Sequence, residues 1–327
     1  MIRHRCPGGG KNLGRRRGVL IEKDFGGRKR ERRLCDRSTA GPGVGRNHPV
    51  RSFRKTCGGK GANQAYACGR LGGDTAFLNA VGDDPLGGEL VRNLQQANVD
   101  TRAIRTVDGV STGMAVVCVD EKGNNSIIVV PGANNLCDVD YLRRNRARFE
   151  ESDIVLLQME IPFESVCYAV ELASGLHKTV ILNPAPAPDS LPDEVYAGLD
   201  YLTPNESEFK HLTGCPTDEV EELAVHCKPL LEKGTRNIII TLGSRGALHV
   251  NREGHTLYRP PEVQAVDTTA AGDTFNAALA RELADGRSTG EAIVFANMAS
   301  ALAVSRVGAQ DSIPSYEEVL DFKKRME

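Results

Sequence analysis

The stretch AVDTTAAGDTFNAALA, residues 265–280, runs from an apolar strand end (VQAV, 263–266) through small residues into a helix predicted over about 272–285. The small residues 270–272 leave the backbone uncovered, so consecutive N–H groups face outward at the positive end of the helix dipole, where a phosphate binds well. Asp273 would repel a resting phosphate, which indicates a chemical task such as general-base catalysis. The alternative is a helix cap, a common role for aspartate.

Short apolar segments alternate with helical patterns from about residue 53 onward. We predict strands within 75–82, 152–160, 178–186 and 236–244, and helices within 84–98, 217–234 and 288–306. This alternation predicts an α/β fold with three layers, in which a mostly parallel central sheet is covered on both faces by helices. Ligands bind such sheets beyond the carboxyl ends of the strands, where the unusual residues of this chain fall.

One segment departs from this alternation. Residues 112–134 read as two alternating strands joined by a turn that contains Gly and Asn, which predicts a β-hairpin. A hairpin inserted into a parallel α/β domain is a candidate lid, and we place this small β lid at about 112–131.

The composition is that of an ordinary globular chain, with 40% hydrophobic and 26% charged residues and a net charge of −2. The absence of a long apolar run argues against a membrane partner. Residues 1–55 hold 17 Lys and Arg against 4 Asp and Glu, but without interleaved aromatic residues we expect no nucleic-acid partner. Nine cysteines without a CxxC pair predict buried thiols in a reducing compartment, hence the cytoplasm.

Eight short motifs follow one another in a characteristic order. They are GGKGANQ (58–64), GDD (82–84), QME (158–160), NPAPA (183–187), TPNESE (203–208), TLGSRG (241–246), DTTAAGDTF (267–275) and GAQDSIP (308–314). With them the chain resembles the ribokinase-type carbohydrate kinase family over about residues 53–327. No GxxxxGK[ST] motif is present, so a phosphate would not be held by a P-loop.

The resemblance implies ATP-dependent phosphorylation of a sugar hydroxyl, with Asp273 as the base and the Ala271 and Gly272 amides stabilising charge on the phosphoryl group. The implied sugar-binding residues are Gly59, Lys60, Asn63 and Glu160, together with Asp273. GGKGANQ and NPAPA point to D-ribose, phosphorylated at its 5-hydroxyl, more than to fructose, adenosine or deoxyribose. A kinase for one of those substrates stays open as an alternative.

The resemblance also implies a nucleotide site and two kinds of metal ion. ATP would contact Asn205, Thr241, Gly243, Gly246 and Asn297, and Mg²⁺ would be organised through water by Glu208. K⁺, as an activator, would lie among Asp267, Thr269, Ala303, Arg306, Gly308 and Ser312. Taken alone, Asn205 and Glu208 also fit a capping box at a helix start, and Asn297 a helix-surface amide.

The segment 1–52 does not fit the resemblance, because it lacks the Asn-x-Asp motif with which the family's first central strand ends. Its one apolar run, GVLI (18–21), has only four residues, and we expect this to be too short for a buried central strand. We therefore expect 1–52 to be a non-native product of a shifted reading frame or a misassigned start, or disordered, rather than a genuine basic extension. A catalytically impaired sugar- or nucleotide-binding protein follows as a further alternative.

The resemblance also implies an oligomeric state. The family's lids pair between subunits, which implies a homodimer.

Overall fold

The computed structural model describes residues 18–21, 56–119 and 125–326. Most of the segment 1–52, and with it the hypothesis of a non-native or disordered N-terminus, lies outside these described residues.

A central sheet of eight strands runs through this part of the chain in the order β12-β11-β10-β9-β8-β7-β1-β2. Neighbours from β2 to β10 pair in parallel, while β10–β11 and β11–β12 are antiparallel. The strands are β1 (Gly18–Ile21), β2 (Thr75–Leu78), β7 (Ile154–Leu157), β8 (Thr179–Leu182), β9 (Tyr201–Leu202), β10 (Asn237–Thr241), β11 (Ala247–Asn251) and β12 (Gly254–Tyr258). The predicted mostly parallel sheet is confirmed.

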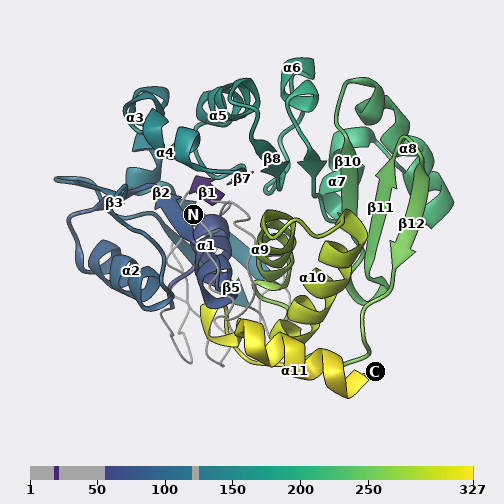
Figure 1. Ribbon diagram of the computed structural model, residues 1–327. Helices are drawn as coiled ribbons and strands as arrows, with labels where there is room; N and C mark the ends of the chain where they lie inside the picture. The colour runs from purple at the N-terminus through teal and green to yellow at the C-terminus, as the bar shows by residue number, and fades with distance from the viewer. Residues whose placement is uncertain (1–17, 22–55, 120–124, 327) are drawn as a thin grey trace, which may run out of the picture.

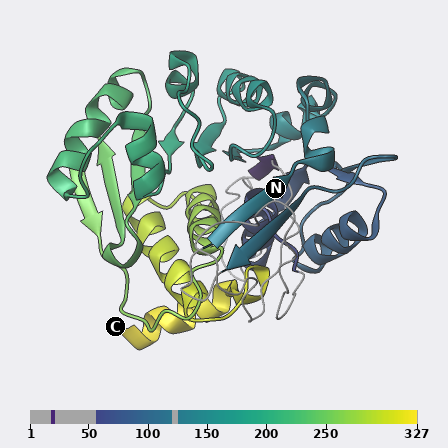
Figure 2. The ribbon, with the colours of Figure 1, turned by 180° about the vertical axis from the view of Figure 1, so that it is seen from behind.

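Helices cover both faces of this sheet (Figures 1 and 2). One layer holds α1 (Lys60–Arg70), α9 (Ala271–Ala284) and α10 (Thr289–Val304), with α2 (Pro85–Gln96) and α11 (Tyr316–Met326) beside them. The other layer holds α3 (Val139–Arg144), α4 (Arg146–Glu151), α5 (Phe163–Gly175), α6 (Asp193–Ala197), α7 (Glu206–Thr213) and α8 (Val220–Glu232). The predicted three-layer α/β fold is therefore present.

Alternation along the strands builds a separate core on each face. Leu156 belongs to the buried cluster under α1 and α9, whereas its neighbour Leu157 belongs to the cluster under α5 and α8. Successive side chains of a strand point to opposite faces, so both faces of a fully covered strand are apolar. This explains the continuous apolar runs in the sequence.

Two expectations about strands were wrong. GVLI forms β1 and pairs in parallel with β2 and β7, although we expected it to be too short. Its length is no obstacle, because both neighbours also have four residues. The segment 263–266 is not a strand but a loop, in which Val266 is 56% exposed, so its apolar residues do not mark a buried element.

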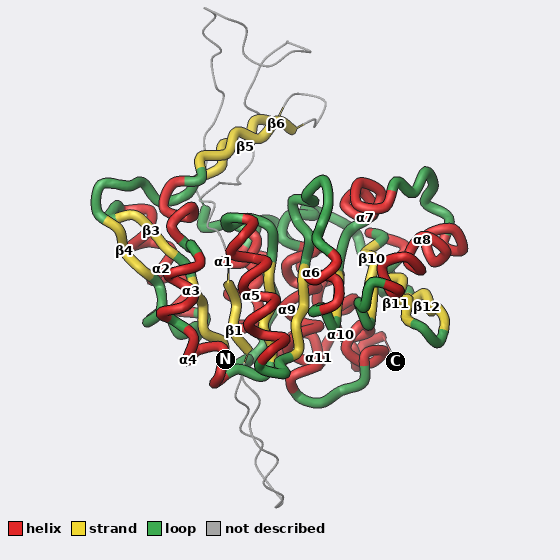
Figure 3. The backbone as a smooth tube through the Cα atoms, turned by 90° about the horizontal axis from the view of Figure 1, so that it is seen from above, coloured by secondary structure: helices red, strands yellow, loops and turns green. Residues whose placement is uncertain are grey.

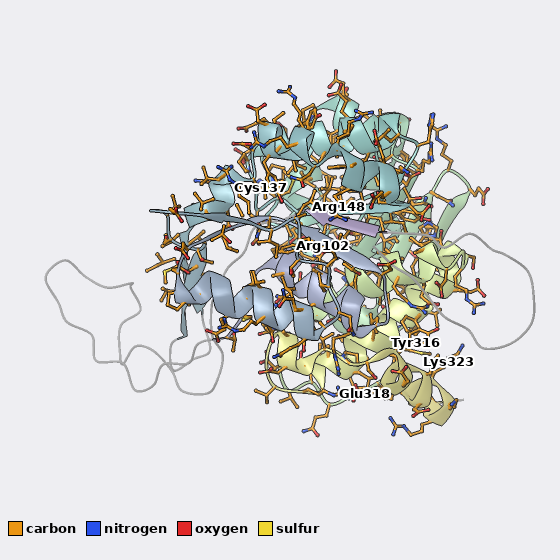
Figure 4. The ribbon with its side chains drawn as sticks, turned by 60° about the vertical axis from the view of Figure 1, so that its left-hand side comes forward. Arg102, Cys137, Arg148, Tyr316, Glu318 and Lys323 are labelled. Carbon is orange, nitrogen blue, oxygen red and sulfur yellow. The ribbon has the colours of Figure 1, made fainter. Side chains whose placement is uncertain are left out.

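The segment 75–82 also differs from the single predicted strand, since it divides at Asn79 into β2 and β3 (Ala80–Gly82). β3 pairs with β4 (Arg105–Val107) in a small separate sheet. Nearby, Asp100 forms ion pairs with Arg102 and Arg148, which lie close together in Figure 4.

The predicted hairpin is present as β5 (Met114–Val119) paired antiparallel with β6 (Asn125–Val130). It projects away from the rest of the described chain (Figure 3). At its base, the Thr112 N–H and hydroxyl donate to the two carboxylate oxygens of Asp84, each at 2.7 Å. Asp84 thus anchors the hairpin while it also caps α2.

Short 3-10 turns complete the described chain: η1 (Gly132–Leu136), η2 (Gly243–Arg245) and η3 (Gln310–Ser312). None of the helices in the described residues is both long and apolar enough to cross a membrane.

Candidate functional site

The amino end of α9 provides open backbone donors. Ala270 precedes the helix in the left-handed conformation, with φ 60°, and no side chain caps the helix start. Among the described residues, the N–H groups of Gly272 and Asp273 have no backbone acceptor. A Cβ built on Gly272 would meet no atom within 4 Å, so this turn opens onto free space. Unpaired amides at a helix start form an anion site.

Asp273 is not a cap. Its carboxylate accepts hydrogen bonds from the side chains of two α1 residues, with Asn63 Nδ2 at 2.9 Å from Oδ2 and Gln64 Nε2 at 3.1 Å from Oδ1. Asp273 is only 9% exposed, and this burial raises the pKa of its carboxyl, against the opposing effect of the Lys60 charge and of the two amides. A buried carboxylate with a raised pKa is suited to accept a proton.

The start of α1 brings the residues predicted to bind sugar next to Asp273. Gly59 precedes the helix with φ 101°, a conformation that favours glycine. The Lys60 N–H donates to Glu160 Oε2 at 3.1 Å. Lys60 also acts electrostatically on both Asp273 and Glu208. The fold therefore gathers these residues around one carboxylate.

The residues predicted to contact ATP line one cavity of about 370 Å³ at the α9 start. It contains Asn205, Thr241, Gly243, Gly246, Ala271, Gly272 and Asn297, all of them predicted, together with Glu206, Ser207, Phe275 and Ser300. We missed these last four. Ser300 could have been found, because it follows Asn297 by three residues and so shares its helix face.

Asn205 and Glu208 form the predicted capping box at the start of α7. Asn205 Oδ1 accepts from the Glu208 N–H at 2.9 Å, while Glu208 Oε2 accepts from the Asn205 N–H at 2.8 Å. Burial raises the pKa of the Glu208 carboxyl, and the nearby Lys60 opposes this shift. Asn297 is buried rather than a surface amide, and its Nδ2 donates to the Tyr258 carbonyl at 2.9 Å.

Two turns predicted to hold a monovalent cation meet behind the α9 start. Asp267 Oδ2 accepts from the Gly308 N–H at 3.1 Å, and Oδ1 accepts from the hydroxyl of Thr269 at 2.7 Å. The Asp267 N–H donates to the carbonyl of Val304, at the end of α10. Of the other residues predicted to lie around this cation, Ala303 and Ser312 are buried. The guanidinium of Arg306 instead pairs with Glu318 at 2.7 Å.

A set of buried amides behind Asp273 was not predicted. Gln64 Nε2 also donates to Asn183 Oδ1 at 3.2 Å, and Gln158 Nε2 donates to Gln64 Oε1. On the other side of Asp273, Gln310 Nε2 donates to Asn63 Oδ1 at 3.2 Å. These residues belong to GGKGANQ, QME, NPAPA and GAQDSIP, so their motif membership was the available signal.

Comparisons with known proteins agree with this arrangement. Residues 35–316 match the model of the pfkB family carbohydrate kinases. A ribokinase of Haemophilus influenzae is 39% identical over 272 residues, which cover 83% of this chain and 88% of that protein. A deoxyribokinase of Salmonella typhi is 33% identical, covering 86% of this chain and 92% of the relative.

The fold is also shared with a solved structure, that of Arabidopsis thaliana ribokinase complexed with ribose and ATP. It is 30% identical, with a TM-score of 0.84 over 95% of this chain and 99% of the other. The resemblance seen in the sequence is confirmed, and it extends over most of the chain. The chain belongs to the pfkB family of carbohydrate kinases and is an ATP-dependent sugar kinase.

Proposed function

We propose that this chain transfers the γ-phosphoryl group of ATP to the 5-hydroxyl of D-ribose and so produces ribose 5-phosphate and ADP. The observation that carries the proposal is the position of Asp273. Its carboxylate faces the donors of α1, while Gly272, one residue earlier, lines the cavity of the predicted nucleotide residues. The base and the phosphate-binding amides therefore belong to one helical turn between two sites.

The reaction follows from this placement. Asp273 accepts the proton of the sugar hydroxyl while the hydroxyl oxygen forms a bond to the γ-phosphorus and the bond to the bridging oxygen of ADP breaks. The open N–H groups at the α9 start stabilise the charge on the transferring phosphoryl group. The ammonium of Lys60, which acts electrostatically on Asp273, favours the anionic base before transfer.

Ribose as the substrate is supported by the ribokinase relatives, one of which is 39% identical to this chain. A second candidate is deoxyribose, which the 33% identity to a deoxyribokinase favours. The two sugars differ by the 2-hydroxyl, and a site built to bind a hydroxyl rejects a substrate that lacks it by large factors. Comparing kcat/KM for the two sugars decides between them.

Two metal ions belong to the proposal. Mg²⁺ would offset charge on the phosphates and would be held through water near Glu208, which suits an ion that keeps several of its waters. No group of three or more His, Cys, Asp or Glu in the described residues could hold a metal ion directly. K⁺ would bind as an activator at the two turns that the hydrogen bond between Gly308 and Asp267 joins. The carboxylate and carbonyl oxygens of these turns are suitable ligands.

We further propose that the β5–β6 hairpin closes over the sugar and pairs with a second copy to form a homodimer. Ile128, Val129 and Val130 on β6 are 55%, 49% and 38% exposed, and such a row of apolar side chains gains from being covered. Cytoplasmic location is proposed from the cysteines, since six of those in the described residues are free thiols, namely Cys57, Cys68, Cys137, Cys167, Cys215 and Cys227.

The experiment is a steady-state assay with ATP and a panel of ribose, deoxyribose, fructose and adenosine, applied to the full chain and to Asp273→Asn. We expect ribose to be preferred, and the variant to lose about 10²- to 10⁴-fold in kcat. ATP affinity should stay nearly unchanged, because Asp273 is not among the residues that line the cavity.

Asp321→Asn is the matched control, because this carboxylate is exposed on α11, pairs with Lys324 and belongs to neither the predicted sugar-binding residues nor the cavity lining. It should leave kcat unchanged. Equal turnover by Asp273→Asn and the unaltered chain would show that Asp273 is not the base. ATP binding without turnover of any sugar would favour the impaired binding protein instead.

A further inference from the structure

Gln64 is fully buried on α1 and uses its whole amide group. Its Nε2 donates to Asp273 Oδ1 at 3.1 Å and to Asn183 Oδ1 at 3.2 Å, while its Oε1 accepts from Gln158 Nε2. Gln64 and Gln158 each have 0% exposure. Gln64 therefore contacts the carboxylate from behind, without a surface that a substrate could reach.

The direction of these hydrogen bonds is set by the carboxylate. An ionised carboxylate only accepts, so the atom of Gln64 that faces Asp273 is the amide nitrogen. The Gln64 oxygen then faces Gln158 and requires a donor from it. Asn183 offers its oxygen to Gln64, and its Nδ2 accordingly donates to the Thr203 carbonyl at 2.8 Å.

Gln158 is left with an unsatisfied group as a result. Its Oε1 is buried without a hydrogen-bond partner in the described part of the chain. A buried acceptor without a partner is costly, and turning the amide over would place two oxygens against each other at Gln64. The fold thus retains an unpaired atom at Gln158 in an arrangement that keeps Gln64 donating to Asp273.

The two oxygens of Asp273 are held differently. Oδ2 accepts from Asn63, which is 6% exposed and predicted to contact the sugar. Oδ1 accepts from Gln64, which has no exposed surface. The donor at Oδ1 can therefore stay in place when a sugar enters and changes the partners of Asn63.

We propose that Gln64 is the positioning residue of the Asp273 base: it fixes the rotation of the carboxylate and stabilises its ionised form. The inference rests on the proposed function, since it deepens the role given there to Asp273. Among the charged groups nearby, Lys60 on α1 lowers the pKa of Asp273, whereas Asp273 itself raises the pKa of Glu208 on α7.

Loss of the Gln64 donor should change the pKa of Asp273 in a defined direction. Burial already raises the pKa of Asp273, and the Gln64 hydrogen bond opposes this shift. Without the donor the pKa rises further, so a larger fraction of the base is protonated at a given acidic pH. The acid limb of the pH profile of kcat/KM, which reports the base of the free enzyme, therefore moves to higher pH.

The test compares pH profiles of the full chain and of Gln64→Met, which keeps a long side chain but cannot donate. Loss of one hydrogen bond to a charged group predicts a shift of the acid limb by about one pH unit or more. KM for ATP should stay unchanged. Gln64→Glu serves as a second variant, because the new carboxyl can donate to Asp273 only while it is protonated. Its kcat/KM should therefore fall as the pH rises and this carboxyl ionises, a loss that the unaltered chain does not show.

Thr235→Val is the matched control for a lost buried hydrogen bond. Thr235 has 0% exposure, and its hydroxyl donates to the Tyr196 carbonyl at 3.0 Å, away from the site. It should lower thermal stability without moving the acid limb. If the folded Gln64 variants show the same pH profile as the unaltered chain, Gln64 has a merely structural role and the inference is overturned.

Failure of the proposed function gives a different result. If the unaltered chain phosphorylates a sugar other than ribose, the same limb is measured with that sugar. If no sugar is turned over, the Asp273 carboxyl is titrated by NMR of carbon-labelled aspartate, with Asp273→Asn for assignment. A pKa that stays constant on Gln64→Met overturns the inference, whichever sugar is used. If Gln64→Met does not fold, the Gln64→Glu profile decides.

Discussion

Arg281 on α9 is the most deeply buried charged residue in the described chain, and its replacement tests how much a buried ion pair contributes to stability. It is 1% exposed and forms ion pairs with Glu282 and, at 3.0 Å, with Asp285. Its Nε donates to the Leu71 carbonyl at the end of α1, at 3.2 Å. The guanidinium also stacks over Tyr316 of α11 at 3.9 Å, a residue that Figure 4 labels. One side chain thus joins three helices.

The expected cost of Arg281→Met follows from what is left behind. Glu282 is 5% exposed and would keep a carboxylate without its neighbouring cation. Removing one partner of a buried ion pair costs about 3–5 kcal/mol. Loss of the contact with the Tyr316 ring adds up to about 2 kcal/mol, part of which methionine regains by filling the space. We expect a loss of about 4 kcal/mol, a large part of the stability of a typical domain.

The second variant, Arg281→Met with Glu282→Met, removes both charges. Apolar replacement of a buried pair is often nearly neutral, so the double variant should be at least about 2 kcal/mol more stable than Arg281→Met alone. Urea unfolding followed by circular dichroism gives these free energies, since the chain has no tryptophan for fluorescence. Additive losses from the two single variants would refute an unpaired Glu282 as the cause.

The pH dependence provides an independent check. Burial raises the pKa of the Glu282 carboxyl, and Arg281 opposes this shift. In Arg281→Met the pKa rises further. At pH well below the usual glutamate range, Glu282 is protonated in both the folded and the unfolded state and carries no penalty. As pH increases, the unfolded chain ionises first and stability is lost, so the destabilisation should be larger at pH 8 than near pH 5.

Three further predictions concern the site and the hairpin. Gly272→Ala should leave the fold as stable or up to about 1 kcal/mol more stable, since Gly272 does not need a positive φ and its added methyl meets no atom within 4 Å. That methyl enters the cavity, so calorimetry should show ATP binding weakened by tenfold or more. Asn205→Ala removes the α7 cap and should lower the free energy of unfolding by about 1 kcal/mol. Ile128→Asp on the exposed face of β6 should leave unfolding unchanged and shift light scattering toward the monomer.

Much of the fold was predictable because its signals are local. The helices expected within 84–98 and 288–306 appear as Pro85–Gln96 and Thr289–Val304, each started by the side chain of a capping residue. The capping box of Asn205 and Glu208 was likewise readable from residues three apart. Helix starts are specified by a few adjacent side chains, which a single sequence displays directly.

The errors have a non-local origin. GVLI is a strand because β2 and β7 supply its hydrogen bonds, and no pattern within residues 18–21 reveals those neighbours. The segment 263–266 has the apolar residues of a strand but no partner strand in the described sheet. Strand formation depends on partners distant in sequence, so composition is a weaker guide to strands than to helices.

The amides around Asp273 show the same difficulty within the site. Gln64 and Asp273 are 209 residues apart, and Gln64 and Asn183 are 119 apart, so their contact could not be derived from spacing. Yet these contacts decide the chemistry. Burial alone would keep the carboxyl protonated and useless as a base, whereas strong donors alone would make it too weak a base. Burial raises the pKa of Asp273, while the Lys60 charge and the Asn63 and Gln64 amides lower it, and this balance is what the proposed base needs in order to be ionised and still accept a proton.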